Sequence, residues 1–102
     1  MRNGDDATQA ELAALRAEVD EIDQQIMLLL GVRFRCTDMI DELKQAHDLP
    51  AADPERAAQQ LQRIRDLAVD AGVPPELAVN ILRTIIDTVV DHHRVRRERP
   101  YS

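Results

Sequence analysis

The stretch that decides the fold runs from Leu12 to Lys44 and reads LAALRAEVDEIDQQIMLLLGVRFRCTDMIDELK. Apolar side chains recur in it every three or four residues, which is the period of a helix that packs along one face. The members of this apolar stripe are Leu12, Leu15, Val19, Ile22, Ile26, Leu29, Cys36, Ile40 and Leu43. The pattern predicts one helix from a cap at Thr8 to a stop at residues 47–50, about 38 residues and roughly 57 Å long.

Arg33 occupies a position of the stripe where an apolar residue is expected. A guanidinium left unpaired in a helical core costs on the order of several kcal/mol. We therefore expect an anion opposite Arg33, either a carboxylate of the protein or a carboxylate of a ligand. Lys44 lies three turns further along, about 16 Å away, and points within roughly 20° of the same direction. Two cations on one helix face favour a carboxylate of a ligand over a carboxylate of the protein.

Two shorter helices are predicted after the first. One should open at Asp53, an N-cap followed by proline, and close at Gly72. The other should start near residues 74–76 and continue to about Arg94 or beyond. Because no strand alternation appears, we expect an all-α fold of three helices. The predicted organisation is a flexible N-terminus (1–7), a helical domain (8–94) and a basic C-terminal tail (95–102).

The first helix is nearly twice as long as either of the others, so two shorter helices of one chain cannot cover its stripe at both ends. A second chain should cover the remainder. We therefore expect an obligate, intertwined homodimer in which the long helices cross the subunit boundary.

Composition limits the function classes. The chain has 102 residues, 44% of them apolar, and a net charge of −6, as expected of one soluble acidic domain rather than a nucleic-acid-binding surface. No apolar run approaches the roughly 20 residues of a membrane span. Cys36 is the single cysteine and residues 1–9 lack the apolar core of a signal peptide, so we expect a cytoplasmic protein without membrane contact.

Other cations join Arg33 and Lys44 as candidates. Arg56 falls in the first turn of the second helix, where free N–H groups attract anions. His93 prolongs the apolar stripe of the third helix, after Val89. Each also has a plainer interpretation: Lys44 and Arg56 as solvated side chains, Arg33 paired inside the protein, and His93 as a partly exposed helix end.

The basic tail is most simply a solvated helix terminus whose charge suits the helix dipole. Its arginines are Arg96, Arg97 and Arg99. A metal site is not expected, because His92 and His93 point about 100° apart on a helix and lack a third ligand nearby.

These residues resemble the all-helical chorismate mutase class. The resemblance lies in Leu15-Arg16, Ile22-Asp23, Leu29-Leu30-x-x-Arg33 and Lys44, and it continues through Asp53 and Arg56 into Ile85-Ile86-Asp87. The matched motifs run from Leu15 to Asp87. The resemblance implies an intertwined dimer with two active sites and a place in aromatic amino acid biosynthesis.

The resemblance also implies roles for individual residues. Arg16 matches an arginine that one subunit donates to the other subunit's site. The remaining matches, as ligands of a substrate with two carboxylates or as neighbours of its ring, are Arg33, Lys44, Asp53, Arg56 and Val89. The implied reaction rearranges chorismate to prephenate without a nucleophile or cofactor. Fixed cations can hold the compact conformer and stabilise charge on the ether oxygen. Lys44 and His93 are the candidates for that oxygen.

Three departures from the family pattern affect the pocket. Ala57 stands where several mutases carry a glutamate that holds the ring hydroxyl, Val89 stands where some have a serine, and His93 replaces a glutamine or glutamate. Imidazole can donate as a neutral N–H or as a cation. The loss of that glutamate at Ala57, together with the Pro-Glu-Arg-Ala-Ala run at 54–58, also resembles isochorismate pyruvate lyases and 4-amino-4-deoxychorismate mutases. A non-catalytic helical dimerisation module ranks last, because it would not need Arg33 in its stripe.

Overall fold

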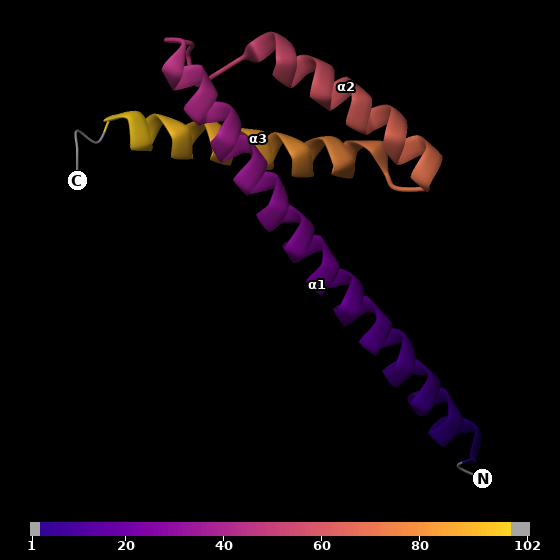
Figure 1. The fold of residues 1–102 in the computed structure, drawn as a ribbon. Helices are drawn as coiled ribbons and strands as arrows, with labels where there is room; N and C mark the ends of the chain where they lie inside the picture. The colour runs from indigo at the N-terminus through magenta and orange to yellow at the C-terminus, as the bar shows by residue number, and fades with distance from the viewer. Residues whose placement is uncertain (1–2, 99–102) are drawn as a thin grey trace. The chain divides into compact units, whose positions relative to one another are not determined.

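The computed structural model describes residues 3–98, which form three helices: α1 (Asn3–Ala46), α2 (Pro54–Ala71) and α3 (Pro75–Glu98) (Figure 1). These residues contain no strand, so the predicted all-α class with a long first helix is confirmed. None of the three helices, over the part of the chain described, is both long and apolar enough to cross a membrane.

The start of the first helix differs from prediction. α1 begins at Asn3 rather than after Thr8, whose hydroxyl donates to the Gly4 carbonyl at 2.7 Å within the helix and therefore does not cap it. α3 continues to Glu98, in agreement with a third helix that runs to about Arg94 or beyond. Residues 1–2 and 99–102, including Arg99, lie outside the described residues.

The predicted bounds of α2 are confirmed. The Asp53 carboxylate accepts a hydrogen bond from the Arg56 backbone N–H at 3.1 Å, which satisfies one free donor of the first turn. At the other end Gly72 has φ 73°, a left-handed conformation that glycine adopts without a Cβ clash. Its N–H and that of Val73 bond to the carbonyls of Val69 and Ala68.

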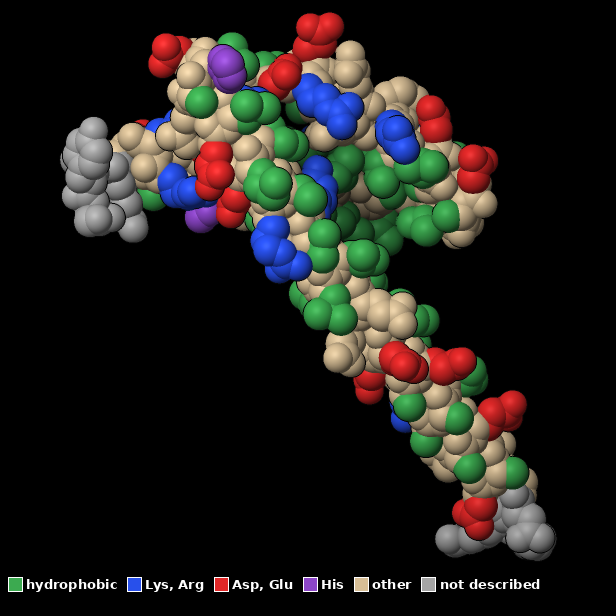
Figure 2. Space-filling model, in the orientation of Figure 1, with side chains coloured by type: hydrophobic (Ala, Val, Ile, Leu, Met, Phe, Trp, Pro, Cys, Tyr) green, Lys and Arg blue, Asp and Glu red, His purple; other side chains and the backbone are tan. Residues whose placement is uncertain are grey.

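The chain divides into two compact units between Cys36 and Thr37, and α1 contributes to both. The first unit, over its described residues, is the helical segment 3–36. Its apolar stripe is exposed: Leu15, Val19 and Ile22 have exposed fractions of 53%, 54% and 53%. Hydrophobic side chains can be followed along this segment in Figure 2. The stripe is an apolar surface that the single chain does not cover.

The second unit, described over residues 37–98, contains the end of α1 together with α2 and α3. α2 packs against α3. The buried apolar residues are Ala68, Val79 and Val89. An apolar groove of about 320 Å³ lies between the two helices, lined by Ile64, Leu67, Ala68, Ala71, Val73, Ala78, Ile81, Leu82 and Ile85. The core of this unit is therefore small, and an apolar surface remains open beside it.

Candidate functional site

The two candidate cations of the first unit are Arg16 and Arg33. Arg16 is exposed and Arg33 is half-buried. Within residues 3–98 neither side chain makes a hydrogen bond or an ion pair. The other two half-buried arginines of this range do: Arg65 pairs with Glu76, and Arg97 pairs with Asp41. Arg33 is therefore the half-buried guanidinium that the described chain leaves unneutralised.

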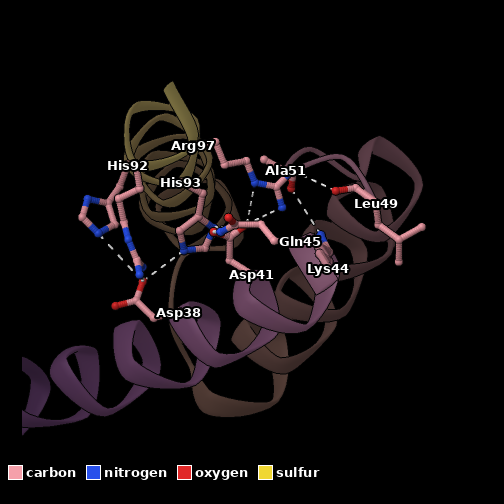
Figure 3. Close-up of polar contacts among 10 residues, drawn as sticks. Asp38, Asp41, Lys44, Gln45, Leu49, Ala51, His92, His93 and Arg97 are labelled. Atoms are coloured by element: carbon pink, nitrogen blue, oxygen red, sulfur yellow. Dashed lines mark hydrogen bonds and ion pairs between the residues drawn. The ribbon is translucent and has the colours of Figure 1, made fainter. Parts of the chain in front are cut away.

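Lys44 lies in the second unit, in the last turn of α1, and is half-buried. Its Nζ donates to the carbonyl of Ala51 at 3.2 Å, across the loop that joins α1 to α2 (Figure 3). An ammonium has three N–H donors, so this contact leaves two for a ligand. Lys44 is therefore only partly solvated, because one of its donors is bound to the neighbouring loop.

Asp53 and Arg56 lie together at the start of α2. The Asp53 carboxylate is the N-cap, and Arg56 follows in the first turn with its guanidinium exposed and unpaired within residues 3–98. Asp53 also lines a cavity of about 380 Å³ between the start of α2 and α3, with Ala57 and Arg94 among its other lining residues. Lys44, Arg56, Val89 and His93 do not line this cavity.

His93 is buried, with an exposed fraction of 5%, so its interpretation as a partly exposed helix end is wrong. Its Nε2 lies 3.1 Å from Oδ1 of Asp38, and its Nδ1 lies 3.8 Å from Oδ1 of Asp41 (Figure 3). An imidazolium would direct one N–H toward each carboxylate, whereas a neutral ring has one donor only. Val89, one turn earlier on α3, is a core residue with an exposed fraction of 8%.

The sequence analysis missed Asp41, which is completely buried. Arg97 donates to its Oδ1 from Nε at 3.1 Å and also from Nη2, and Gln45 Nε2 donates to Oδ2 at 2.7 Å. Burial raises the pKa of the Asp41 carboxyl, but these hydrogen bonds and the charges of His93 and Arg97 outweigh burial and hold the pKa below its usual value. Asp41 is therefore a buried carboxylate in the folded protein.

Arg97 is not a solvated tail residue, so that interpretation is wrong for Arg97, which pairs with the buried Asp41. Arg96 is exposed, as the interpretation expects, and pairs with Asp38 at 3.2 Å at the surface. Asp38 and Asp41 are three residues apart on α1, and His93, Arg96 and Arg97 share a face of α3 by the same spacing. This spacing in the sequence could have indicated a charged face on each helix, but it does not show that the faces of α1 and α3 meet.

No group of three or more metal-ligating side chains gathers within residues 3–98. The candidate cations offer another chemistry, the binding of anions. Arg16, Arg33 and Arg56 are unpaired within residues 3–98, and Lys44 keeps two N–H donors free.

Comparisons with known proteins identify the family of the chain. A family model described as chorismate mutase type II matches residues 15–94. The chorismate mutase of Methanocaldococcus jannaschii is 31% identical over 77 residues, which cover 76% of this chain and 78% of that protein.

Two longer relatives match the same region. The T-protein of Enterobacter agglomerans is 38% identical over 77 residues, which are 76% of this chain and 21% of that protein. The bifunctional chorismate mutase/prephenate dehydratase of Aquifex aeolicus is 40% identical over 79 residues, 74% of this chain and 22% of that protein. The chain thus spans about a fifth of these two relatives and most of the archaeal one. With the family match running from Leu15 to Arg94, the chain belongs to the chorismate mutase type II family.

Proposed function

We propose that the protein is a chorismate mutase, which rearranges chorismate to prephenate. The observation that carries the proposal is Arg33: it is half-buried within the family match and is left without an anion by residues 3–98. A carboxylate of the substrate supplies that anion. The binding of a dicarboxylate then offsets the cost of holding the cation there.

Catalysis rests on fixed charges. Arg33 and Arg56 bind the substrate carboxylates and hold the compact conformer in which the new carbon–carbon bond forms. Lys44 donates to the ether oxygen, where negative charge grows as the carbon–oxygen bond breaks. Asp53 lies near the ring, and Val89 lies near a carboxylate. The reaction needs no cofactor, because bond breaking and bond making are concerted within one molecule.

His93 is the second candidate donor to the ether oxygen. Its ring nitrogens already face Asp38 and Asp41, so it reaches the substrate only by exchanging its hydrogen bond with Asp38. Lys44 needs no such exchange, since two of its donors remain available. We therefore place Lys44 first.

The active enzyme is proposed to be a cytoplasmic homodimer, in which Arg16 of one chain reaches the site of the other. The support is the exposed stripe of α1 together with the open apolar groove between α2 and α3. Uncovered apolar surfaces of this kind mark interaction sites, and a second copy presents a matching helix.

The test is to incubate the protein separately with chorismate, isochorismate and 4-amino-4-deoxychorismate and to identify the products by chromatography and mass spectrometry. Prephenate from chorismate, at a kcat/KM far above the other two, is the expected result. Salicylate and pyruvate from isochorismate, or rearrangement of the amino substrate alone, would replace the mutase by one of its relatives. If none of the three substrates gives a product, the remaining interpretation is a non-catalytic helical dimerisation module.

A further inference from the structure

Arg97 joins three parts of the second unit through one side chain. It lies near the end of α3, and its Nε and Nη2 hold the buried Asp41 of α1. Its third nitrogen, Nη1, donates to the carbonyl of Leu49 at 2.8 Å, in the loop between α1 and α2 (Figure 3). A planar guanidinium can make these contacts together because its donors form a rigid fork.

The loop that Arg97 holds is also the loop that holds Lys44. The Leu49 N–H donates back to the Lys44 carbonyl at 2.7 Å, and Lys44 Nζ donates to the Ala51 carbonyl at 3.2 Å. Between them Asp48 turns the chain with φ 55°, a left-handed conformation that is uncommon for a residue with a side chain. The position of the Lys44 ammonium therefore depends on where Leu49 and Ala51 lie.

The same loop delivers the start of α2. Two residues beyond Ala51 comes Asp53, the N-cap, and Arg56 follows in the first turn. Because Arg97 binds the Leu49 carbonyl and Asp41 together, it also fixes the direction in which the chain leads to Asp53 and Arg56.

We infer that Arg97 is a positioning residue for the proposed active site: by binding Asp41 and the Leu49 carbonyl at once, it sets the loop that orients Lys44 and begins α2. The inference rests on the proposed function, since it concerns the placement of the substrate's cationic ligands. Misplacement of a catalytic group by about 1 Å can lower a rate about a hundredfold.

A purely structural role would be different: Arg97 would only neutralise the buried charge of Asp41. Replacing a buried ion pair with apolar residues of similar size restores stability and often increases it. The double variant Asp41→Leu/Arg97→Met therefore removes both charges of the buried pair and leaves the Leu49 carbonyl without its donor. It separates the neutralisation of Asp41 from the positioning of the loop that contains Leu49.

The experiment measures the melting temperature, kcat, KM and the hydrogen-exchange rate of the Leu49 amide in the wild type, Arg97→Met, the double variant and Arg83→Met. Arg83 is exposed on the same helix and makes no ion pair within residues 3–98, so its variant is the matched control. We expect Arg97→Met to lower both stability and kcat/KM. The double variant should recover the melting temperature, yet keep a kcat at least about tenfold below wild type and a faster-exchanging Leu49 amide.

Recovery of full kcat in the double variant, or wild-type exchange at Leu49 in Arg97→Met, would overturn the positioning role. A wild-type protein inactive on chorismate, isochorismate and 4-amino-4-deoxychorismate would overturn the proposed function instead, and with it the catalytic part of the inference. The exchange measurement needs no substrate, so these two failures are distinguishable.

Discussion

The two units of the chain differ in how much of their apolar and charged surface they bury. Residues 3–36 present a regular apolar stripe with exposed side chains, whereas residues 37–98 bury a small apolar core together with a charged cluster built on Asp41. In the first unit the apolar surface is available for a partner chain. In the second, charges are neutralised within the chain itself. Arg33 belongs to the first unit, and within residues 3–98 its charge, like the apolar stripe beside it, is left without a partner.

Ile22, in the exposed stripe, gives the most direct test of whether the first unit binds a partner chain. Ile22→Glu should weaken the dimer about a thousandfold, because an ionised side chain would have to be buried in the apolar contact between chains. Analytical ultracentrifugation across a concentration series measures the change. Gln24→Glu, which adds the same charge on another face of the helix, is the control. A wild-type protein that sediments as a stable folded monomer would remove the dimer and the donated role of Arg16.

Arg33→Met tests whether the unpaired cation serves a ligand. We expect kcat/KM to fall by roughly a hundredfold or more, the size seen when one charge-stabilising donor is removed. The melting temperature should stay the same or rise, because an apolar side chain of similar length replaces an unneutralised cation. Steady-state kinetics and calorimetry on the same preparation give both values. An active but strongly destabilised variant would assign Arg33 to the framework.

Asp41→Asn tests the second unit. It removes the anion that Arg97 needs, so the free energy of unfolding should fall by about 3 kcal/mol, as for other broken buried pairs. Denaturant titration measures it. The control is Glu76→Gln, which breaks the exposed pair with Arg65 and should change stability by less than about 0.5 kcal/mol.

Acid should reduce the difference between Asp41→Asn and wild type. The pKa of Asp41 is lower in the folded protein than its usual 3.8, so the unfolded chain takes up the proton first as the pH falls. The stabilisation by Asp41 is thus present above pH 3.8 and is lost as the pH falls through the folded-state pKa. The free energies of unfolding of the two proteins, measured between about pH 2 and pH 6, should approach each other as the pH falls below 3.8. A constant difference over that range would show that the charge of Asp41 is not what stabilises the fold.

The smallest expected effect is at His93, the second candidate donor to the ether oxygen. Its ring nitrogens face Asp38 and Asp41, so the ring reaches the substrate only by giving up its contact with Asp38. His93→Gln keeps a side-chain N–H donor, so it should keep most of the kcat/KM that His93→Ala loses. Steady-state kinetics of the wild type and the two variants measures the change. An unchanged kcat/KM in His93→Ala would leave Lys44 as the sole donor.

The sequence by itself determined the helices and the candidate cations. Period and capping residues are local properties, so the all-α class and the bounds of α2 followed from Asp53, Pro54 and Gly72. The start of α1 did not follow, because Thr8 has the chemistry of a cap but can equally bond back to Gly4 inside a helix.

Only the tertiary structure decided which helix faces meet. Asp38 and Asp41 could have been solvated, and Arg97 was interpreted as a solvated tail residue, until α1 and α3 were placed together around His93. The spacing of charged residues in the sequence does not identify their ion-pair partners, because a carboxylate on a helix face can bind either water or a guanidinium. The candidate cations could therefore be found along the chain, whereas the contacts of Arg97 with Asp41 and with the Leu49 carbonyl could be found only once the helices were packed together.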